Sequence, residues 1–293
     1  MIGDLLKQLF PSLGRFIAYH LLRPFRRGHE SAKVAWLPEL GVTDPLKFPK
    51  FSVPVFWHTS DPERVKQLIA ELLPLLGAGY YFGDNLLTWS RSISFVDDLR
   101  FRNAYEDNIQ NPSDAAIAWR RYILACAGYH CVQLEGDFVE CGVYRGTGIK
   151  TLVDYLGGKS FPKQFYGYDT YEYDTVPGRR SEGQEAGFYE GVRQRFDAYP
   201  QVHLIRGLIP DSFADGCPDK ISYLHIDLNN AESEIATLEA LFDRVVPGGI
   251  IILDDYEWAA YRPQKIAEDS WLERRKHHVF PLPTGQGLVL KRG

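Results

Sequence analysis

Cysteine is scarce in this sequence, and the few residues present are not spaced as pairs. Cys126, Cys131, Cys141 and Cys217 are the four among 293 residues, and they show neither a C-x-x-C motif nor the spacing of zinc ligands. The sequence therefore indicates neither a disulfide scaffold nor a structural zinc site. Reduced thiols of this kind are typical of a cytoplasmic protein.

Long apolar runs are also missing. The best run near the start, "FIAYHLL", is interrupted by His20 and has no cleavage site after it, so we expect neither a transmembrane segment nor a signal peptide. The first 28 residues mix Leu and Phe with basic residues, and this arm could lie on a membrane surface. These basic residues are Lys7, Arg15, Arg23, Arg26 and Arg27. Packing against the body or a second subunit is the favoured alternative. The extended arm indicates a homo-oligomer.

The excess of basic charge that a nucleic-acid-binding protein needs is absent. The formal net charge is -5 and the isoelectric point is near 5.9, whereas a phosphate backbone binds a basic face. The hydrophobic share of 45% and the charged share of 24% are ordinary for a globular protein. The length allows one large domain, or one domain with an appendage.

Two parts of different character follow one another along the chain. Residues 1–130 predict a mainly helical N-terminal extension, with one helix over 61–77, a second over 114–136 and short helices between them. Residues 131–293 alternate helical stretches with five apolar runs, "FVEC", "FYGYD", "VHLIR", "ISYLHID" and "GIIILDD". This alternation predicts a doubly wound α/β fold with a parallel sheet, and the turn at Thr284-Gly285 predicts a β-hairpin at its edge.

The segment "DFVECGVYRGTGIKT", residues 137–151, runs from the first of these strands through a glycine turn into a helix. Ile149 separates Gly148 from Lys150, which excludes a P-loop, and the glycine spacing G-x-x-x-G-x-G is not the nicotinamide fingerprint. The acid Glu140 suits a cofactor with an amino group and a sulfonium cation, and would be a poor neighbour for a pyrophosphate. A tight turn without a ligand is the alternative.

Acidic residues stand at the ends of the later strands. Asp169 follows the glycine turn at the distance at which an acid reaches a ribose. Asp227 ends the fourth strand and the pair Asp254 and Asp255 ends the fifth, so three carboxylates are expected to meet at one edge of the sheet. A hard divalent cation such as Mg²⁺ would neutralise them. The alternative is that Asp227 caps the next helix and that one of the pair faces water.

At this point a family resemblance can be stated. The segments "GDFVECGVYRGTG", "FYGYDTYE", "GLIPDSF", "LHIDLNNAESE", "VVPGGIIILDDY" and "GQGLVLKR" resemble the class I S-adenosylmethionine-dependent methyltransferases. More narrowly, residues 83–293 are similar to the macrocin/mycinamicin sugar O-methyltransferases. The resemblance implies a mostly parallel seven-stranded Rossmann-like sheet. It also implies Mg²⁺-dependent methyl transfer to a hydroxyl, often on a deoxysugar of a glycosylated natural product.

The resemblance also assigns roles to residues. It places the metal on Asp227, Asp254 and Asp255, and it makes Asp227 the candidate general base. Asn229 stands where family members carry a second acid, so the site loses a negative charge. His225 is a second candidate base, although a place behind the site is more typical of its position on the strand. The residues expected to bind the cofactor are Glu140, Gly142, Tyr144, Arg145, Gly146, Thr147, Gly148, Asp169, Thr170, Gly207 and Asp227.

Residues 170–191 lie between the second strand and the next helix and combine glycine, proline, charge and tyrosine. They predict a mobile lid over bound ligand, in which Arg179 and Arg180 would face an anionic group of the acceptor; an ordinary surface loop is the alternative. Two other functions stay open. One is metal-free methylation of a carboxylate, phenol or amine, and the other is a non-catalytic cofactor-binding scaffold.

Overall fold

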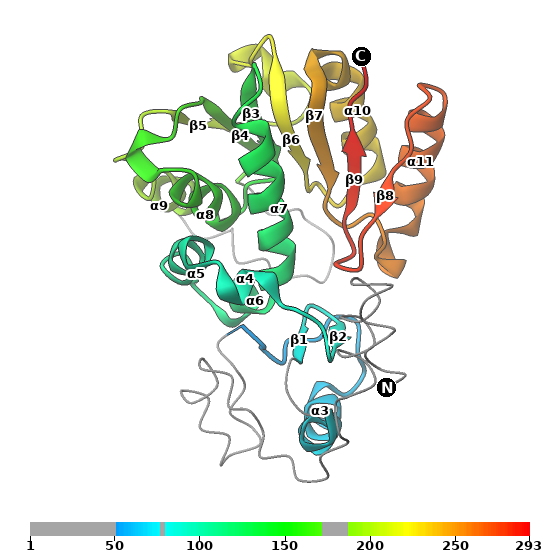
Figure 1. Cartoon of the computed structure of the whole chain (residues 1–293). Helices are drawn as coiled ribbons and strands as arrows, with labels where there is room; N and C mark the ends of the chain where they lie inside the picture. The colour runs from blue at the N-terminus through cyan, green and yellow to red at the C-terminus, as the bar shows by residue number, and fades with distance from the viewer. Residues whose placement is uncertain (1–50, 77–79, 172–186) are drawn as a thin grey trace, which may run out of the picture.

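A seven-stranded sheet forms the upper part of the molecule, and a smaller N-terminal part lies below it (Figure 1). The computed structural model describes residues 51–76, 80–171 and 187–293. The strand order is β5-β4-β3-β6-β7-β9-β8, in which the first five strands are parallel and the last two antiparallel. The strands are β3 Asp137–Cys141, β4 Phe165–Asp169, β5 Val202–Arg206, β6 Ile221–Ile226, β7 Val245–Leu253, β8 Phe280–Pro281 and β9 Gly287–Leu290. The predicted doubly wound sheet with a terminal hairpin is therefore confirmed.

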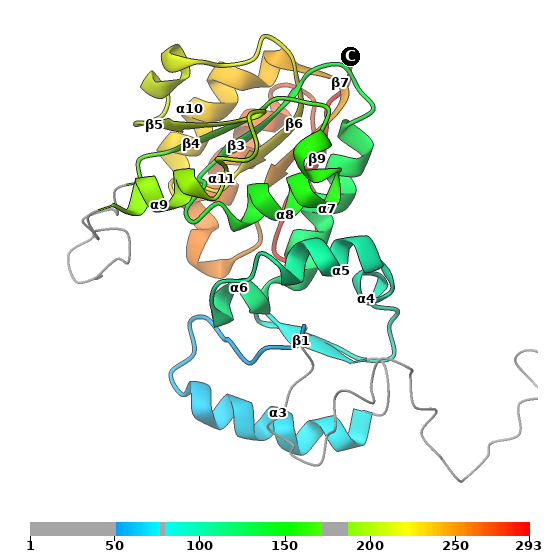
Figure 2. The same cartoon turned by 90° about the vertical axis from the view of Figure 1, so that its left-hand side faces the viewer.

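Helices cover both faces of this sheet, as Figure 2 shows. Alternate side chains of each strand point to opposite faces, which separates the core into two layers. Phe138 and Tyr223 face α7, α8 and α9, whereas Val139 and Leu224 face α10 and α11. The helices are α7 Ala118–Cys131, α8 Thr147–Tyr155, α9 Phe188–Gln194, α10 Ala231–Leu241 and α11 Arg262–Glu273. Short 3-10 turns follow at η2 Gly158–Ser160, η4 Asp211–Asp215, η5 Phe242–Arg244 and η6 Ala259–Tyr261.

The described residues of the N-terminal part form four helices and a small hairpin. Its elements are α3 Pro62–Leu76, β1 Tyr81–Gly83, β2 Leu86–Thr88, α4 Ser94–Asp97, α5 Leu99–Glu106 and α6 Pro112–Ala116. Asp61 caps α3 by accepting from the amide of Arg64 at 2.9 Å, which confirms the predicted start of that helix. The β1–β2 hairpin replaces part of the expected short-helical stretch. Its turn is made by Asp84 and Asn85, with φ of 52° and 58°.

The second long helix differs from the prediction over 114–136, because it is broken at Ile117 and ends at Cys131. Two tyrosine hydroxyls donate to backbone carbonyls that would accept hydrogen bonds within a continuous helix. Tyr105 donates to the carbonyl of Asp114, and Tyr81 donates to that of Ala116 at 3.1 Å. After the break, α7 runs from the N-terminal part up to the sheet (Figure 1). The break therefore sets the direction from which α7 approaches the carboxyl ends of the strands.

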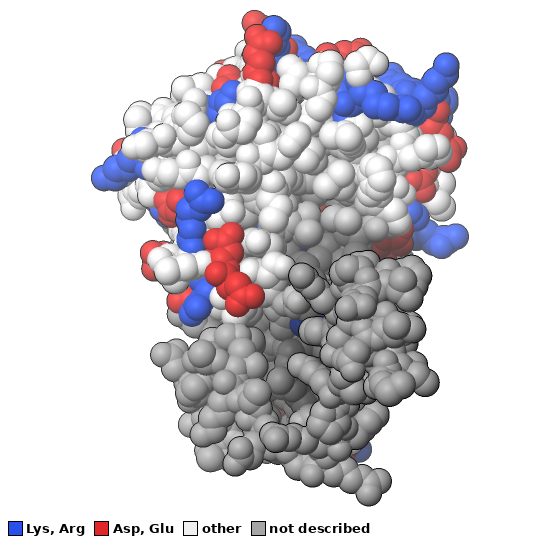
Figure 3. All heavy atoms as spheres, in the orientation of Figure 1, with Lys and Arg blue, Asp and Glu red and all other residues white. Residues whose placement is uncertain are grey.

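The α11 helix was not predicted from the sequence, although proline in its first turn is typical of a helix start. Of the helices within the described ranges, none is long and apolar enough to cross a membrane. Figure 3 shows acidic and basic side chains lying side by side on the coloured part of one face. The basic arm of the first 28 residues and the proposed lid with Arg179 and Arg180 lie wholly or largely outside the described residues.

Candidate active site

A cavity of about 810 Å³ opens at the carboxyl ends of β6 and β7, between the sheet and the N-terminal part. Its volume lies within the range of small-molecule sites. Side chains from three regions line it: the N-terminal part, α7 and the strand ends. They include Trp57, Asp84, Arg120, Arg121, Tyr144 and Trp258. Of the predicted site residues, Tyr144, Asp227, Asp254 and Asp255 line this cavity together.

The glycine turn after β3 packs tightly against the end of β6. Gly142 has a φ of +96°, and a Cβ atom there would lie 1.9 Å from the carbonyl oxygen of Asp227. Gly146 has a φ of +73° and forms the N-cap of α8. Both positions therefore require glycine. Over Gly148, a Cβ atom would meet Nη1 of Arg121 at 2.8 Å and Oε1 of Glu140 at 3.3 Å, so these two charged groups converge at the start of α8.

Asp169 has its carboxylate engaged within the protein. Its Oδ2 accepts from the amides of Val143 and Tyr144 at 2.8 and 2.7 Å, and its Oδ1 accepts from the amide of Tyr171 at 2.8 Å. The side chain thus fixes the glycine turn, and its role as a ribose ligand stays a prediction. Gly207 lies beside it, with its amide 3.0 Å from the carbonyl of Asp169.

Three remaining predicted cofactor residues lie next to the glycine turn or at the end of β4. The carbonyl of Arg145 accepts from Arg195, and Thr147 donates weakly to Asp114 at 3.5 Å. Thr170 follows β4, and its carbonyl accepts from Arg206 at 3.3 Å. The glycine turn and the end of β4 are therefore adjacent, as a cofactor site requires, while contacts with the cofactor itself stay predictions.

His225 connects two acids beneath the cavity. Its side chain is 1% exposed, and its Nδ1 and Nε2 lie 3.0 Å from Oε2 of Glu140 and 3.2 Å from Oδ1 of Asp254. Burial alone would lower the pKa of His225, but its hydrogen bonds with these two carboxylates raise it to about 10. The imidazole is then charged at neutral pH and donates from both nitrogens. This geometry favours a bridging role for His225 over that of a base.

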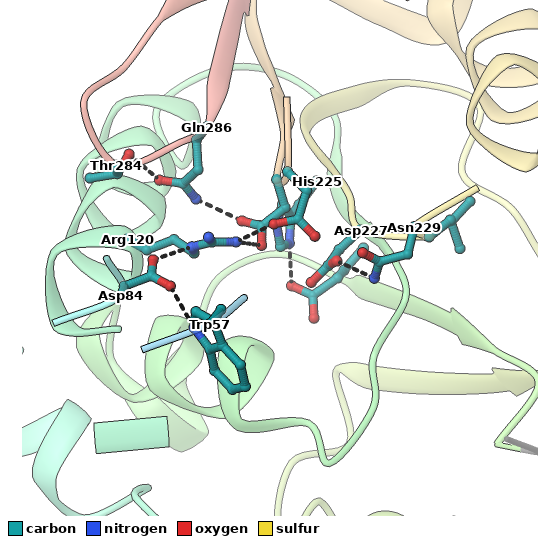
Figure 4. A network of polar contacts seen from close by, with 12 residues as sticks. Trp57, Asp84, Arg120, His225, Asp227, Asn229, Thr284 and Gln286 are labelled. Carbon is teal, nitrogen blue, oxygen red and sulfur yellow. Dashed lines mark hydrogen bonds and ion pairs between the residues drawn. The ribbon is translucent and has the colours of Figure 1, made fainter. Parts of the chain in front are cut away.

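Arg120 lies among the carboxylates at the edge of the sheet (Figure 4). Its Nη1 donates to Oδ2 of Asp254 and, at 2.9 Å, to Oδ1 of Asp255, while its Nε donates to Oδ2 of Asp84 at 3.0 Å. Gln286 donates to the other oxygen of Asp254 at 2.8 Å. The convergence of acids predicted from the sequence is therefore present, but an arginine from α7 compensates their charge.

The pKa values of these acids depend on burial and on the charges around each carboxylate. Burial would raise the pKa of Asp254, but Arg120 and His225 hold it well below its ordinary value. Burial raises the pKa of Asp255 and of Asp84 despite the opposing charge of Arg120. Burial, together with the charges of Asp254 and Asp255, raises the pKa of Asp227 well above its ordinary value. The pKa of Asp227 is thus shifted in the direction that suits a general base.

Whether these residues fit a metal ion can be judged from their contacts. Among the described residues, one group brings possible ligand atoms within 4.8 Å of one another, namely His225, Asp227 and Asp254. Both nitrogens of His225 face carboxylates, and both oxygens of Asp254 accept hydrogen bonds. Oδ1 of Asp255 accepts a hydrogen bond from Arg120. In this arrangement the set does not fit a divalent cation, which needs free oxygen ligands.

Sequence reasoning missed Arg120, Arg121 and Asp84. One signal was available for Arg120, because it shares a helical face with the buried residues Leu124, Ala127 and Cys131. A buried arginine requires acidic partners. Nothing in the local sequence identified Asp84 as such a partner, since it lies 36 positions away.

Comparison with known proteins places this site in a family. Residues 127–278 match the family described as macrocin O-methyltransferase (TylF). This chain belongs to that family. It is an S-adenosylmethionine-dependent methyltransferase, as the resemblance implied. No curated protein matches the sequence.

Two solved structures are similar in fold. The O-methyltransferase NovP has a TM-score of 0.52 and 20% identity over 65% of this chain and 88% of its own. The apo form of CalS11, a TDP-rhamnose 3'-O-methyltransferase of calicheamicin biosynthesis, has a TM-score of 0.50 and 16% identity over 80% of this chain and 96% of its own. At these identities the likeness shows the methyltransferase fold alone.

Proposed function

We propose that this protein transfers the methyl group of S-adenosylmethionine to a hydroxyl of a sugar carried by a small molecule. The observation that carries the proposal is Asp227, an acid of raised pKa that lines a cavity beside the glycine turn. Trp57, Trp258 and Tyr261 line the same cavity, and rings of this kind offer broad apolar faces to a sugar. The family and the sugar substrate of CalS11 support this acceptor class.

The charged groups near the start of α8 suit the cofactor's methionyl end. Arg121 lines the cavity, and its buried Nε has no hydrogen-bond partner among the described residues, so it would hold the cofactor's carboxylate. Glu140, whose Oε1 faces the same point over Gly148, would hold its amino group. When bound, the cofactor supplies a methyl group activated by a sulfonium. The protein's task is then to align an acceptor oxygen with that methyl group.

Asp227 would remove the proton of the acceptor hydroxyl. The pKa of an alcohol lies far above that of an ordinary carboxylic acid. The raised pKa of Asp227 narrows this difference in pKa. Asn229 donates to Oδ1 of Asp227 at 3.3 Å, which leaves Oδ2 to face the acceptor. Magnesium assistance stays a prediction from the sequence, and no step of this reaction depends on it. A role in natural-product biosynthesis, a homo-oligomeric state and a cytoplasmic location also stay predictions.

Methyl transfer from labelled cofactor to a panel of nucleotide sugars, glycosides, phenols and amines tests this function. We expect transfer to a sugar hydroxyl, and we expect Asp227→Asn to lower kcat by about 10²–10⁴-fold while the affinity for S-adenosylhomocysteine stays near that of the wild type. Asp197→Asn, which removes an exposed surface acid, is the matched control. Transfer to phenols or amines alone, or full activity of Asp227→Asn, would refute the proposal.

A further inference from the structure

We propose that Arg120 takes the place of a divalent cation in this site, so that methyl transfer by this protein needs no metal. The inference starts from the position of the guanidinium. A single nitrogen, Nη1, contacts both Asp254 and Asp255, the two acids that end β7. A metal held through these two oxygens would compete with the guanidinium for them.

The carboxylate oxygens left over do not form a second ligand set. Oδ1 of Asp254 accepts from Gln286 and lies 3.2 Å from Nε2 of His225. Asp84, the third acid on the guanidinium, also accepts from Nε1 of Trp57 at 3.2 Å. The oxygens that remain for a cation are those of Asp227, Oδ2 of Asp255 and the amide oxygen of Asn229, and Arg120 already brings a positive charge next to them.

Arg120 is fixed from several sides, so it does not easily leave the site. Its side chain is 7% exposed, and its partners Asp84 and Asp254 are 7% and 4% exposed. The ring of Trp258 lies 5.5 Å from its guanidinium carbon, which adds a cation–π contact. Figure 4 shows the side chain reaching from α7 between Asp84 on one side and the end of β7 on the other. Expelling this arginine would leave buried carboxylates without their partner, which is strongly unfavourable.

The exchange of a metal for arginine changes what the site can do. A guanidinium is permanently charged and donates hydrogen bonds, but it offers no coordination position to an acceptor hydroxyl. It therefore balances the charge of Asp254 and Asp255 without acidifying the acceptor directly. Proton removal then falls to Asp227 alone, and a second cation beside Arg120 would be repelled.

The experiment measures metal binding directly. Mn²⁺, a probe for the Mg²⁺ site, is titrated into the full chain with S-adenosylhomocysteine, and free Mn²⁺ is followed by its electron paramagnetic resonance signal. We expect no saturable binding by the wild type, and methyl transfer that is unchanged by EDTA. Arg120→Met keeps the aliphatic stem and removes the charge, so it should gain a saturable Mn²⁺ site that the wild type lacks.

Three further variants sharpen the result. Arg120→Lys keeps a positive charge and should still exclude Mn²⁺, which a merely structural role of Arg120 would not predict. Arg120→Gln serves if the methionine variant does not fold. Arg64→Met removes an exposed arginine and should behave as the wild type.

Saturable Mn²⁺ binding by the wild type that Mg²⁺ competes and Asp254→Asn abolishes would overturn the proposal. So would a folded, uncharged residue at 120 that binds no more Mn²⁺ than the wild type does. The inference rests on the proposed methyl transfer, yet the titration needs no acceptor. Failure of the sugar assay therefore leaves the Mn²⁺ result interpretable.

Discussion

The pairing of His225 with Glu140 and Asp254 makes the stability of this protein depend on pH. The pKa of His225 is raised from 6.5 to about 10 in the folded protein, because two carboxylates compensate for its burial. A raised pKa means that the folded state binds the proton more tightly than the unfolded state does. The stabilisation is therefore complete below the unfolded pKa and is lost as the pH rises through the folded pKa.

The size of the effect follows from this shift. Between the two pKa values, each pH unit removes about 1.4 kcal/mol from the free energy of unfolding. From about pH 6 to about pH 9, linkage with a single site then predicts a loss of about 3 kcal/mol. His225→Gln removes the titrating group and should remove this part of the pH dependence, although the variant is less stable overall at the lower pH.

Urea unfolding of both proteins across this pH range measures the effect. Subtracting the free energy of unfolding of the variant from that of the wild type cancels the titrating groups that are not coupled to His225. His278→Gln, which changes an exposed histidine, is the control and should follow the wild type. A nuclear magnetic resonance titration of labelled histidine supplies a second readout, in which His225 stays protonated above neutral pH. An equal loss of stability in the wild type and His225→Gln, or a neutral His225 at neutral pH, would refute the reasoning.

Three further predictions concern the site and its supports. Because the pKa of Asp227 is raised, kcat/KM should increase with pH through a midpoint above that of an ordinary aspartate; a midpoint at the ordinary value would contradict this. Asp84→Ala leaves Nε of Arg120 without its acceptor, while Asp254 and Asp255 still balance the charge, so it should lower the free energy of unfolding by about 1–3 kcal/mol in urea; no loss would argue against this buried contact. Gly142→Ala places a Cβ atom 1.9 Å from the carbonyl of Asp227, so it should weaken S-adenosylhomocysteine binding in calorimetry, whereas Gly191→Ala, with no atom within 4 Å, should not.

The sheet could be predicted from the sequence because each strand is a short apolar run that is recognisable from its own residues. The run "GIIILDD" is apolar until it ends in acids, and parallel strands bring such ends to one edge. For that reason the meeting of Asp227, Asp254 and Asp255 was correctly expected. The β1–β2 hairpin was missed because strands of three residues carry little periodicity.

The charge balance of the site was beyond local sequence patterns. Magnesium is expected at these acids only if no cation of the chain itself reaches them, and the position of α7 in space decides this. Arg120 lies 134 positions before Asp254, and the break at Ile117 directs its helix toward the sheet. Pairings of this kind depend on tertiary packing, which propensity and spacing do not encode.

The hydrogen-bonded contact between Asp84 and Arg120 also limits how this enzyme can be divided or recombined. Both residues lie upstream of the span 127–278 that matches the family, so a fragment trimmed to that span would lose its own counter-charge. A chimera that grafts a foreign N-terminal part onto this sheet would have to supply an acid at the same place. An exchange of the N-terminal part without such an acid would leave Arg120 short of one of its buried partners.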